Sequence, residues 1–298
     1  MKVSHGFVVI DKPAGITSHD VVSRVRKLAG TKKVGHAGTL DPMATGLLVL
    51  GIESGTKLLT FVVGADKTYE ATIRLGASTI TDDREGELVE QASPESVSAV
   101  SNERINEELA KLKGVISQIP STVSAIKVNG ERAYDRVRAG EVFELKSREV
   151  TISRLEVIGD IRRVDGFIDL DVIVDCSSGT YIRAIARDLG AALGVGGHLT
   201  SLRRTRIGSF DVSNSMQFDG FEGELPILRS VEAVKEVLPT LEITKEETLA
   251  IRQGKRIARS LDQITALTCE DVLVAVAESA GNQSLKSLVV FNEGETNA

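Results

Sequence analysis

The segment Gly35–Gly46 (GHAGTLDPMATG) combines a carboxylate, Asp41, and an imidazole, His36, in a glycine-rich stretch. Glycine-rich loops let the backbone approach a ligand closely, so Asp41 is a candidate nucleophile or base. The same residues allow another interpretation, because Asp before Pro42 is a natural helix N-cap followed by a first-turn proline. In that case His36 is an ordinary loop residue. The local pattern leaves both interpretations open.

The sequence carries no familiar cofactor or metal pattern. Gly51–Lys57 lacks the spacing of a phosphate-binding loop, and no Gly-x-Gly-x-x-Gly opens a helix after a strand. Thr81–Gly86 lacks the ligand spacing of a calcium loop, so we expect an acidic turn there. Two cysteines and four scattered histidines form no metal-ligand spacing. We therefore expect neither a cofactor nor a metal.

Charge is unevenly distributed along the 298 residues. The net charge is −6, yet residues 1–75 hold ten Lys/Arg against six Asp/Glu, whereas residues 219–298 hold eight against fourteen. This argues against binding nucleic acid through overall charge and in favour of local basic sites. Two basic groups, Lys127–Arg138 and Arg203–Arg206, could contact phosphates or could be exposed faces with neutralising partners.

Hydrophobic periodicity predicts the elements that must position these residues. Apolar or alternating runs at 7–10, 47–50, 69–75 and 168–176 predict strands, and apolar spacing at 18–29, 93–114 and 182–193 predicts helices. Tyr181 and Arg183 follow a strand and a polar turn, so they are expected at a helix N-terminus. After Pro239 a short helix over 244–253 and β-rich runs at 272–276 and 288–291 predict a small appended β domain.

Ordered motifs from Asp11 to Arg204 resemble those of the TruB-type tRNA pseudouridine-55 synthases. Gly35–Gly46 is similar to the catalytic loop of that family. The other matching motifs are Asp11-Lys12-Pro13-x-Gly15-x-Thr17-Ser18, Asp66-Lys67-x-Tyr69, Leu75-Gly76 with Thr79, Thr81, Asp83 and Gly86, Ser124-Ala125-x-Lys127, Cys176-Ser177-x-Gly179-Thr180-Tyr181-Ile182-Arg183 and Leu202-Arg203-Arg204. Val123 departs from the family, which often has tyrosine there.

The resemblance implies isomerisation of uridine to pseudouridine in the T-arm of tRNA, in which the C1′–N1 bond breaks and a C1′–C5 bond forms. By this resemblance Asp41, Tyr69 and Arg183 are the catalytic residues. A carboxylate can stabilise or attack the electron-poor sugar carbon. Arg183 would keep Asp41 ionised inside a closed pocket, and Tyr69 would stack on the base near C5.

The resemblance also implies that the target base is flipped out of the folded loop. The residues expected to bind RNA are His36, Lys12, Gly38, Thr39, Tyr181, Leu202 and Lys127. His36 would contact displaced nucleotides, whereas Tyr181 and Leu202 would border the base. An RNA-binding insertion is expected over about residues 121–150.

The implied fold is α/β (α+β), with a mixed, largely antiparallel sheet in a catalytic domain (1–240) and a PUA-like RNA-binding domain (241–298). The implied partner is tRNA, and we expect a cytoplasmic monomer without membrane spans. Three alternatives remain: an RNA-guided relative, a non-catalytic tRNA-folding protein, and a glycosidase, which would need a second carboxylate near Asp41.

Overall fold

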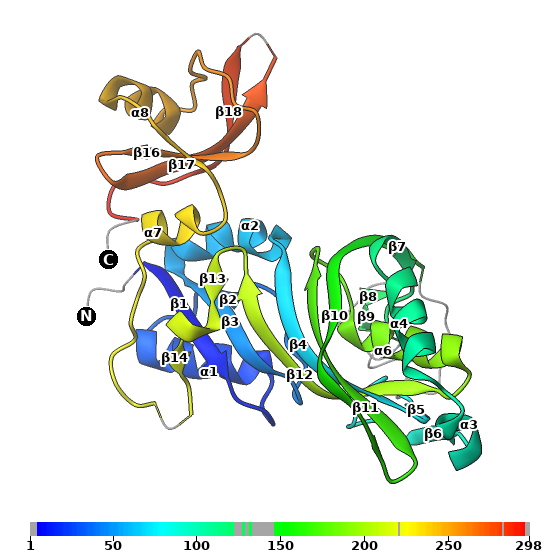
Figure 1. Cartoon of the computed structure of the whole chain (residues 1–298). Helices are drawn as coiled ribbons and strands as arrows, with labels where there is room; N and C mark the ends of the chain where they lie inside the picture. Colours follow the sequence, from blue (N-terminus) through cyan, green and yellow to red (C-terminus); the bar gives the residue numbers. More distant parts are fainter. Residues whose placement is uncertain are drawn as a thin grey trace. The chain divides into compact units, whose positions relative to one another are not determined.

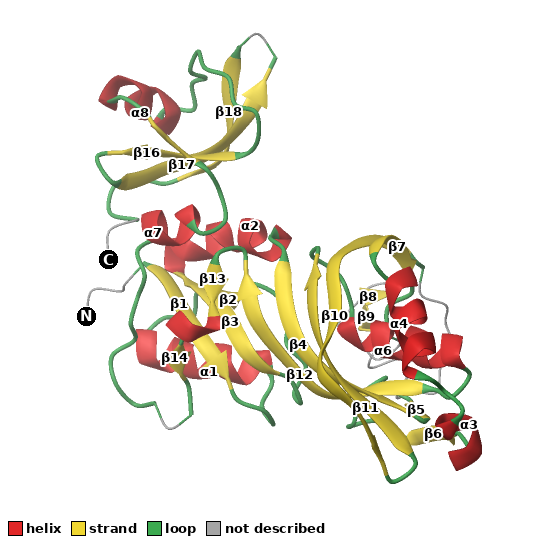
Figure 2. Ribbon diagram, viewed as in Figure 1, coloured by secondary structure: helices red, strands yellow, loops and turns green. Residues whose placement is uncertain are grey.

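The computed structural model describes residues 5–121, 127–128, 131–132, 146–219, 221–281 and 283–295. The fold is mixed α/β, with a large mixed sheet and a separate four-stranded sheet near the C-terminus (Figures 1 and 2). This confirms the predicted fold class. The chain divides into two compact units: residues 1–42, 46–65 and 207–298 form the first, and residues 43–45 and 66–206 form the second.

The first unit contains the N-terminal elements and all elements after residue 207. These are β1 (Gly6–Lys12), α1 (Ser18–Ala29), β2 (Val34–His36), β3 (Thr45–Ile52), the 3-10 helix η1 (Glu53–Leu58), α2 (Leu59–Gly64), β13 (Phe210–Asp211), η2 (Val212–Asn214), β14 (Met216–Gln217), α7 (Ser230–Lys235), β15 (Thr240–Glu242), α8 (Lys245–Arg252), β16 (Thr265–Cys269), β17 (Val272–Ala280) and β18 (Ser284–Val290).

Strands β1 and β3 form the centre of this unit because both of their faces are apolar. They pair antiparallel from Gly6 opposite Ile52 to Lys12 opposite Gly46, with β14 parallel to β1 and β2 antiparallel to β3. Alternate residues enter different cores: Leu48 and Leu50 pack in the cluster that includes the apolar side of α1, whereas Leu47 and Val49 pack in the cluster that includes α7. Burial on both faces explains the continuous apolar run at 47–50.

Helix α1 has its N-cap one residue earlier than the sequence indicated. Thr17, rather than Ser18, is the N-cap, and it forms a capping box with Asp20. The helix ends at Gly30, whose φ of 65° is left-handed, as expected of a glycine at a helix end. The Ser18 hydroxyl is thereby available for a contact outside the helix.

The C-terminal sheet has the order β15-β16-β17-β18 and its own core against α8. It also shares a core with the rest of the first unit, because Ala266, Leu273, Val276 and Phe291 belong to the cluster that contains Leu47 and Val49. Lys57 pairs with Glu295 at 2.9 Å and lies over the ring of Phe291. The β-rich prediction for this region is therefore confirmed.

The second unit contains a five-stranded part of the large sheet, ordered β12-β4-β11-β10-β7, with helices packed against it (Figure 2). Strands β4, β11, β10 and β7 pair antiparallel in succession. The elements of the unit are β4 (Lys67–Leu75), β5 (Ala77–Thr79), β6 (Leu88–Gln91), α3 (Pro94–Ser98), α4 (Asn102–Lys111), β7 (Gly114–Gln118), β8 (Lys127–Val128), β9 (Glu131–Arg132), β10 (Arg148–Val164), β11 (Phe167–Cys176), α6 (Ile182–Leu193) and β12 (Gly197–Ile207).

Strand β11 shows the predicted alternation directly. Its residues Ile168, Leu170, Val172 and Val174 are buried, whereas the alternating aspartates face the other side. There Asp169 holds Arg74 through two bonds of 2.8 and 2.6 Å, and Asp171 accepts a bond from Thr72.

The single helical stripe expected over 93–114 is wrong in detail, because two helices, α3 and α4, occupy it. Ser93 and Ser101 each accept a bond from a backbone N–H and cap a new helix. The apolar period continues across the break, so periodicity alone did not reveal it.

Within the described part of the chain, every helix is too short or too polar to span a lipid bilayer.

Gly190 tests how tightly α6 is packed. A Cβ at this position would overlap with backbone atoms of Gly196 and Gly197. We expect Gly190→Ala to lower the free energy of unfolding, although alanine in an exposed helix interior is normally about 1 kcal/mol better than glycine. Ala191→Gly, at an exposed neighbouring position, should cost only about that amount. Urea unfolding measures both, and a stabilised Gly190→Ala variant would contradict the packing argument.

Candidate active site

Asp41 lies in a loop of the first unit between β2 and β3. Pro42 and Met43 form a turn and no helix begins there, so the helix N-cap interpretation of Asp41 is excluded. The Asp41 side chain is half-buried. Of the two interpretations that the sequence left open, the one in which Asp41 is a functional loop residue therefore remains.

Two buried side chains fix the backbone on either side of Asp41. The Ser18 hydroxyl accepts a bond of 2.9 Å from the Leu40 N–H and donates one of 3.1 Å to the Leu40 carbonyl. The Lys12 ammonium donates to the carbonyls of Pro13 (2.8 Å) and Pro42 (3.3 Å), among others. The loop is therefore held by groups that bond to its backbone.

Lys12 was predicted to contact RNA, and its environment favours another role. Its side chain is completely buried, and its ammonium also donates to the carbonyl of Ile16 at 2.8 Å. A buried lysine whose protons are bonded to backbone carbonyls supports the loop and does not offer its charge to a phosphate at the surface. His36 is the last residue of β2 and not a loop residue as expected. His36 and Gly38 are half-buried and Thr39 is exposed, so these residues fit direct contact with RNA better than Lys12 does.

Gly38 adopts a φ of +98°, a backbone conformation that side chains with a Cβ rarely adopt. The loop thus depends on glycine at this position for its shape, as the glycine-rich composition suggested.

Tyr69 lies in β4 of the second unit, opposite Val174 of β11, and is buried. Lys67, two residues earlier, shares this face and stands opposite Cys176. Desolvation by burial, reinforced by the neighbouring Arg204, lowers the pKa of Lys67 to about 8. Burial likewise raises the pKa of the Cys176 thiol to about 11, so Cys176 is a neutral packing residue.

Arg183 is the second residue of α6 and only 4% exposed. Its Nη1 donates to the Thr81 carbonyl at 2.8 Å and lies 3.5 Å from an Asp83 carboxylate oxygen. Asp83 in turn accepts bonds from the Thr81 hydroxyl (2.5 Å) and the Glu85 N–H (3.0 Å). The position of the guanidinium is therefore set by the turn at residues 81–86.

The structure has the expected acidic turn at Thr81–Gly86, and two of its carboxylates are buried. Asp82 is 8% and Asp83 3% exposed, because each carboxylate faces an arginine of α6. Arg187, one helical turn after Arg183, lies 3.4 Å from Asp82. Burial raises the pKa of Asp82, with Ser121 and Arg187 opposing that shift. Asp83 is the functional candidate that charge patterning missed, since its partner lies a hundred positions away along the chain.

The remaining predicted residues of the second unit have mixed surroundings. Tyr181 is the N-cap residue of α6 and half-buried, and Leu202 is buried in β12. The predicted basic patch Arg203–Arg206 is not a free surface: Arg204 is buried, and Arg206 donates to the Thr68 hydroxyl and lies 3.7 Å from Asp175. The alternative of a neutralising partner therefore holds for Arg206.

Lys127 belongs to the two-residue strand β8, and its side chain lies outside the described residues, as does most of the predicted insertion at 121–150. In the part of the chain that the structure describes, no group of three or more His, Cys, Asp or Glu side chains could hold a metal ion.

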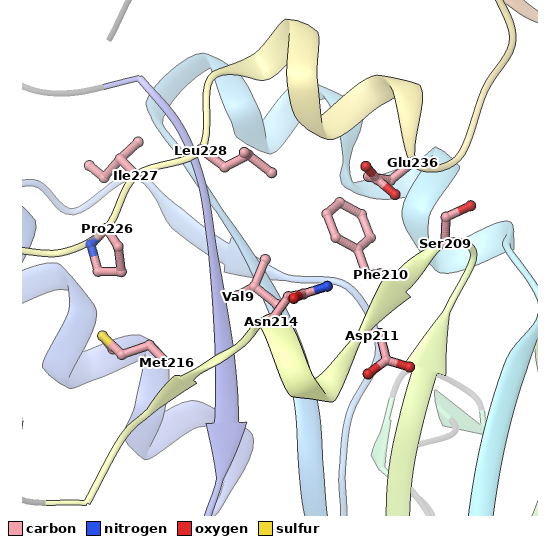
Figure 3. Close-up of a pocket in the computed structure, with 10 residues that line it drawn as sticks. All are labelled: Val9, Ser209, Phe210, Asp211, Asn214, Met216, Pro226, Ile227, Leu228 and Glu236. Carbon is pink, nitrogen blue, oxygen red and sulfur yellow. The ribbon is translucent and has the colours of Figure 1, made fainter.

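A cavity of about 420 Å³ lies elsewhere in the first unit (Figure 3). Val9, Phe210 and Leu228 supply apolar walls, and Asn214 and Glu236 supply polar ones. None of the predicted site residues lines it. The cavity is therefore separate from the loop that carries Asp41.

Comparison with known proteins agrees with this architecture. Residues 26–182 match the model of the TruB family pseudouridylate synthase N-terminal domain, and residues 183–241 match the tRNA pseudouridylate synthase B C-terminal domain. The chain is 50% identical over 299 residues to tRNA pseudouridine synthase B of Leifsonia xyli subsp. xyli (strain CTCB07), which covers 98% of both chains. It is 56% identical over 299 residues to tRNA pseudouridine synthase B of Arthrobacter sp. (strain FB24), covering 96% of both.

Solved structures show the same fold. A chain in the crystal structure of a Cbf5-Nop10-Gar1 complex superposes with a TM-score of 0.71 at 25% identity, covering 96% of this chain and 84% of that chain. Fold and sequence together define a pseudouridine synthase. The chain belongs to the TruB family of pseudouridylate synthases.

Asp83→Asn tests the role of the buried partner of Arg183. The amide keeps the size of the side chain and removes the charge that holds the guanidinium. The family resemblance implies that Arg183 is catalytic, so we expect turnover to fall by about 10- to 100-fold, the range for a small displacement of a catalytic group. Asp171→Asn, which alters an ion pair on the outer face of β11, is the matched control and should retain activity. Steady-state pseudouridine formation measures both variants. Equal activity of the two would show that turnover does not depend on the charge of Asp83.

The lowered pKa of Lys67 predicts a pH dependence of stability. Between pH 8 and about 10.5 the unfolded chain holds a proton that the folded chain has released, so the free energy of unfolding should rise with pH in that window. Lys67→Met should remove this contribution, whereas Lys113→Met, at an exposed position, should leave it intact. Urea unfolding at pH 7.5, 9 and 10 measures the slopes. If the free energy of unfolding of wild type and of Lys67→Met changed equally with pH, the pKa of Lys67 would not be lowered in the folded chain.

Proposed function

We propose that this chain converts uridine 55 in the T-arm of tRNA to pseudouridine. The observation that carries the proposal is identity of 50% and more, over nearly the full length, with proteins named tRNA pseudouridine synthase B. That identity spans both units, so the Asp41 loop and the Arg183 helix both lie within it. The reaction moves the uracil from N1 to C5 attachment and gains or loses no atoms.

Asp41 acts at the ribose carbon. Breaking the C1′–N1 bond leaves positive character at C1′, which a carboxylate can stabilise or attack. A carboxyl group that bound substrate shields from water has a raised pKa, whereas a neighbouring guanidinium lowers the pKa. The proposal therefore pairs Asp41 with Arg183.

Tyr69 stacks on the uracil while the base turns to present C5 to C1′. Its burial in β4 limits the ring to few orientations, which suits a residue that holds a flat base. Once the new carbon–carbon bond exists, C5 releases its proton and N1 takes one up. The proton balance of the reaction is therefore closed without a cofactor.

The RNA contacts of the proposal come from several segments. His36, Gly38 and Thr39 present the loop to displaced nucleotides, and Tyr181 and Leu202 border the flipped base. Lys127, in the insertion at about 121–150, contacts phosphate. Residues 1–240 act as the catalytic domain and residues 241–298 as a PUA-like module for RNA. The enzyme works as a monomer, and its tRNA substrate places it in the cytoplasm.

An RNA-guided synthase is the second candidate, favoured by the structural likeness to a chain of the Cbf5-Nop10-Gar1 complex. Such an enzyme would need a guide RNA and partner proteins. Activity of the isolated chain on a bare T-arm hairpin distinguishes the two candidates, because only the stand-alone enzyme turns over that substrate.

Asp41→Asn tests the central residue. The substrate is a T-arm hairpin with tritium at C5 of the target uridine, and tritium release reports the completed isomerisation. We expect release by the wild type and essentially none by Asp41→Asn, because the amide can neither attack nor stabilise C1′. Asp160→Asn, at an exposed position of β10, is the control. Equal release by Asp41→Asn would remove the assigned role, and free uracil as product would indicate a glycosidase.

A further inference from the structure

Two side chains at the start of β10 and the end of β7 both contact Tyr181. Gln118 is the last residue of β7 and Arg148 the first of β10, and the antiparallel register sets them directly opposite each other. Opposed residues of paired strands have Cβ atoms about 5 Å apart, so the two side chains can act on one target.

Gln118 holds the backbone of Tyr181 through both polar atoms of its amide. The Tyr181 N–H donates to Oε1 of Gln118 at 2.8 Å, and Nε2 of Gln118 donates to the Tyr181 carbonyl at 3.1 Å. Gln118 is 1% exposed, so these bonds form away from water. Tyr181 is the N-cap of α6 and makes no side-chain cap bond of its own. Gln118 thereby fixes the residue from which the helix starts.

Arg148 holds the ring of Tyr181. Its Cζ lies 4.6 Å from the ring centroid, within the range of a cation–π interaction. Gly179, with a φ of +89°, lies close to this guanidinium. A Cβ at position 179 would be 3.6 Å from Cζ of Arg148. Nε and Nη2 of Arg148 are buried and have no hydrogen-bond partner among the described residues.

Such an arrangement is costly, because buried donors of a charged group normally have partners. Elsewhere in the chain the same Nε–Nη2 edge grips a carboxylate, in Arg74 with Asp169 and in Arg259 with Glu247. Stability alone therefore does not account for Arg148. Among the described residues, the interaction found for its guanidinium is the contact with the Tyr181 ring.

We propose that Gln118 and Arg148 are a pair of positioning residues that fix both the backbone and the ring of Tyr181 for the isomerisation. This rests on the proposed function, in which Tyr181 borders the flipped base. Arg183 follows Tyr181 by two residues, so the same pair sets the start of the helix turn that carries the guanidinium. Neither residue touches the reacting atoms. Their effect falls on the rate of the chemical step and not on the affinity for RNA.

The test separates rate from affinity. Single-turnover tritium release, with enzyme in excess over the T-arm hairpin, gives the rate constant, and filter binding gives the Kd. Gln118→Glu keeps the oxygen that accepts from the Tyr181 N–H. It replaces the Nε2 donor with a second oxygen, which repels the Tyr181 carbonyl oxygen. Arg148→Met keeps much of the length of the side chain and removes the charge. For both we expect a rate constant lower by about 10- to 100-fold with a Kd within about 3-fold of wild type.

Arg148→Lys keeps the charge and should fall between Arg148→Met and wild type, because an ammonium also interacts with a ring but has no planar face to stack. Matched controls are Gln91→Glu on exposed β6 and Arg154→Met on β10, whose side chain pairs with Glu156 at the surface. Both controls should match wild type.

A spectroscopic measurement tests the contact independently of turnover. The chain contains three tyrosines, so ring-labelled tyrosine gives few NMR signals, and Tyr181→Phe identifies that of Tyr181. Arg148→Met should shift this signal and Arg154→Met should not. An unmoved signal would overturn the stacking argument even if the variant were poorly active.

The outcomes also separate this proposal from the proposed function. Wild-type rates for Gln118→Glu and Arg148→Met, with Asp41→Asn inactive, would overturn the positioning role alone. A loss that appears only in the Kd would make these residues RNA contacts and would also overturn it. An inactive wild type, or an active Asp41→Asn, would instead reject the proposed function.

Discussion

The buried ion pair between Arg183 and Asp83 is the constraint on which the second unit depends. A guanidinium in a protein does not lose its proton, so a side chain that is 4% exposed needs a fixed counter-charge. Desolvation offsets most of the attraction within such a pair, yet removal of one partner leaves the other charge buried and uncompensated. The turn at residues 81–86 must therefore keep its shape, and the Thr79 hydroxyl and Leu199 N–H, which bond to the Asp83 and Asp82 carbonyls, hold it there.

The same kind of support recurs at three segments that carry candidate site residues. Lys12 and Ser18 bond to the backbone beside Asp41, Thr81 and Asp83 hold Arg183, and Gln118 bonds to the backbone of Tyr181. In each case hydrogen bonds from outside the segment secure a loop residue or a helix start. Loops lack the hydrogen-bond ladder of strands, so their precision has to come from such contacts.

The sequence supported much of the fold because its physical signals are local. Alternation in β4 and β11, the apolar run of β3 and the glycine after α1 each follow from the period of a strand or the end of a helix. Errors arose where a polar contact overrode the period: Ser101 started a second helix within one apolar stripe, and Thr17 rather than Ser18 capped α1 because the Ser18 hydroxyl bonds to Leu40.

The sequence by itself determined the family, the fold class and the candidate residues Asp41, Tyr69 and Arg183, since motif order and residue type are properties of the chain alone. Tertiary structure decided the environments. It placed Lys12, a candidate for phosphate contact, in a buried position where it supports the loop, buried the acidic turn against α6 and set Gln118 opposite Arg148. Burial and pairing depend on residues far apart along the chain, and no local pattern records which charge will meet which partner.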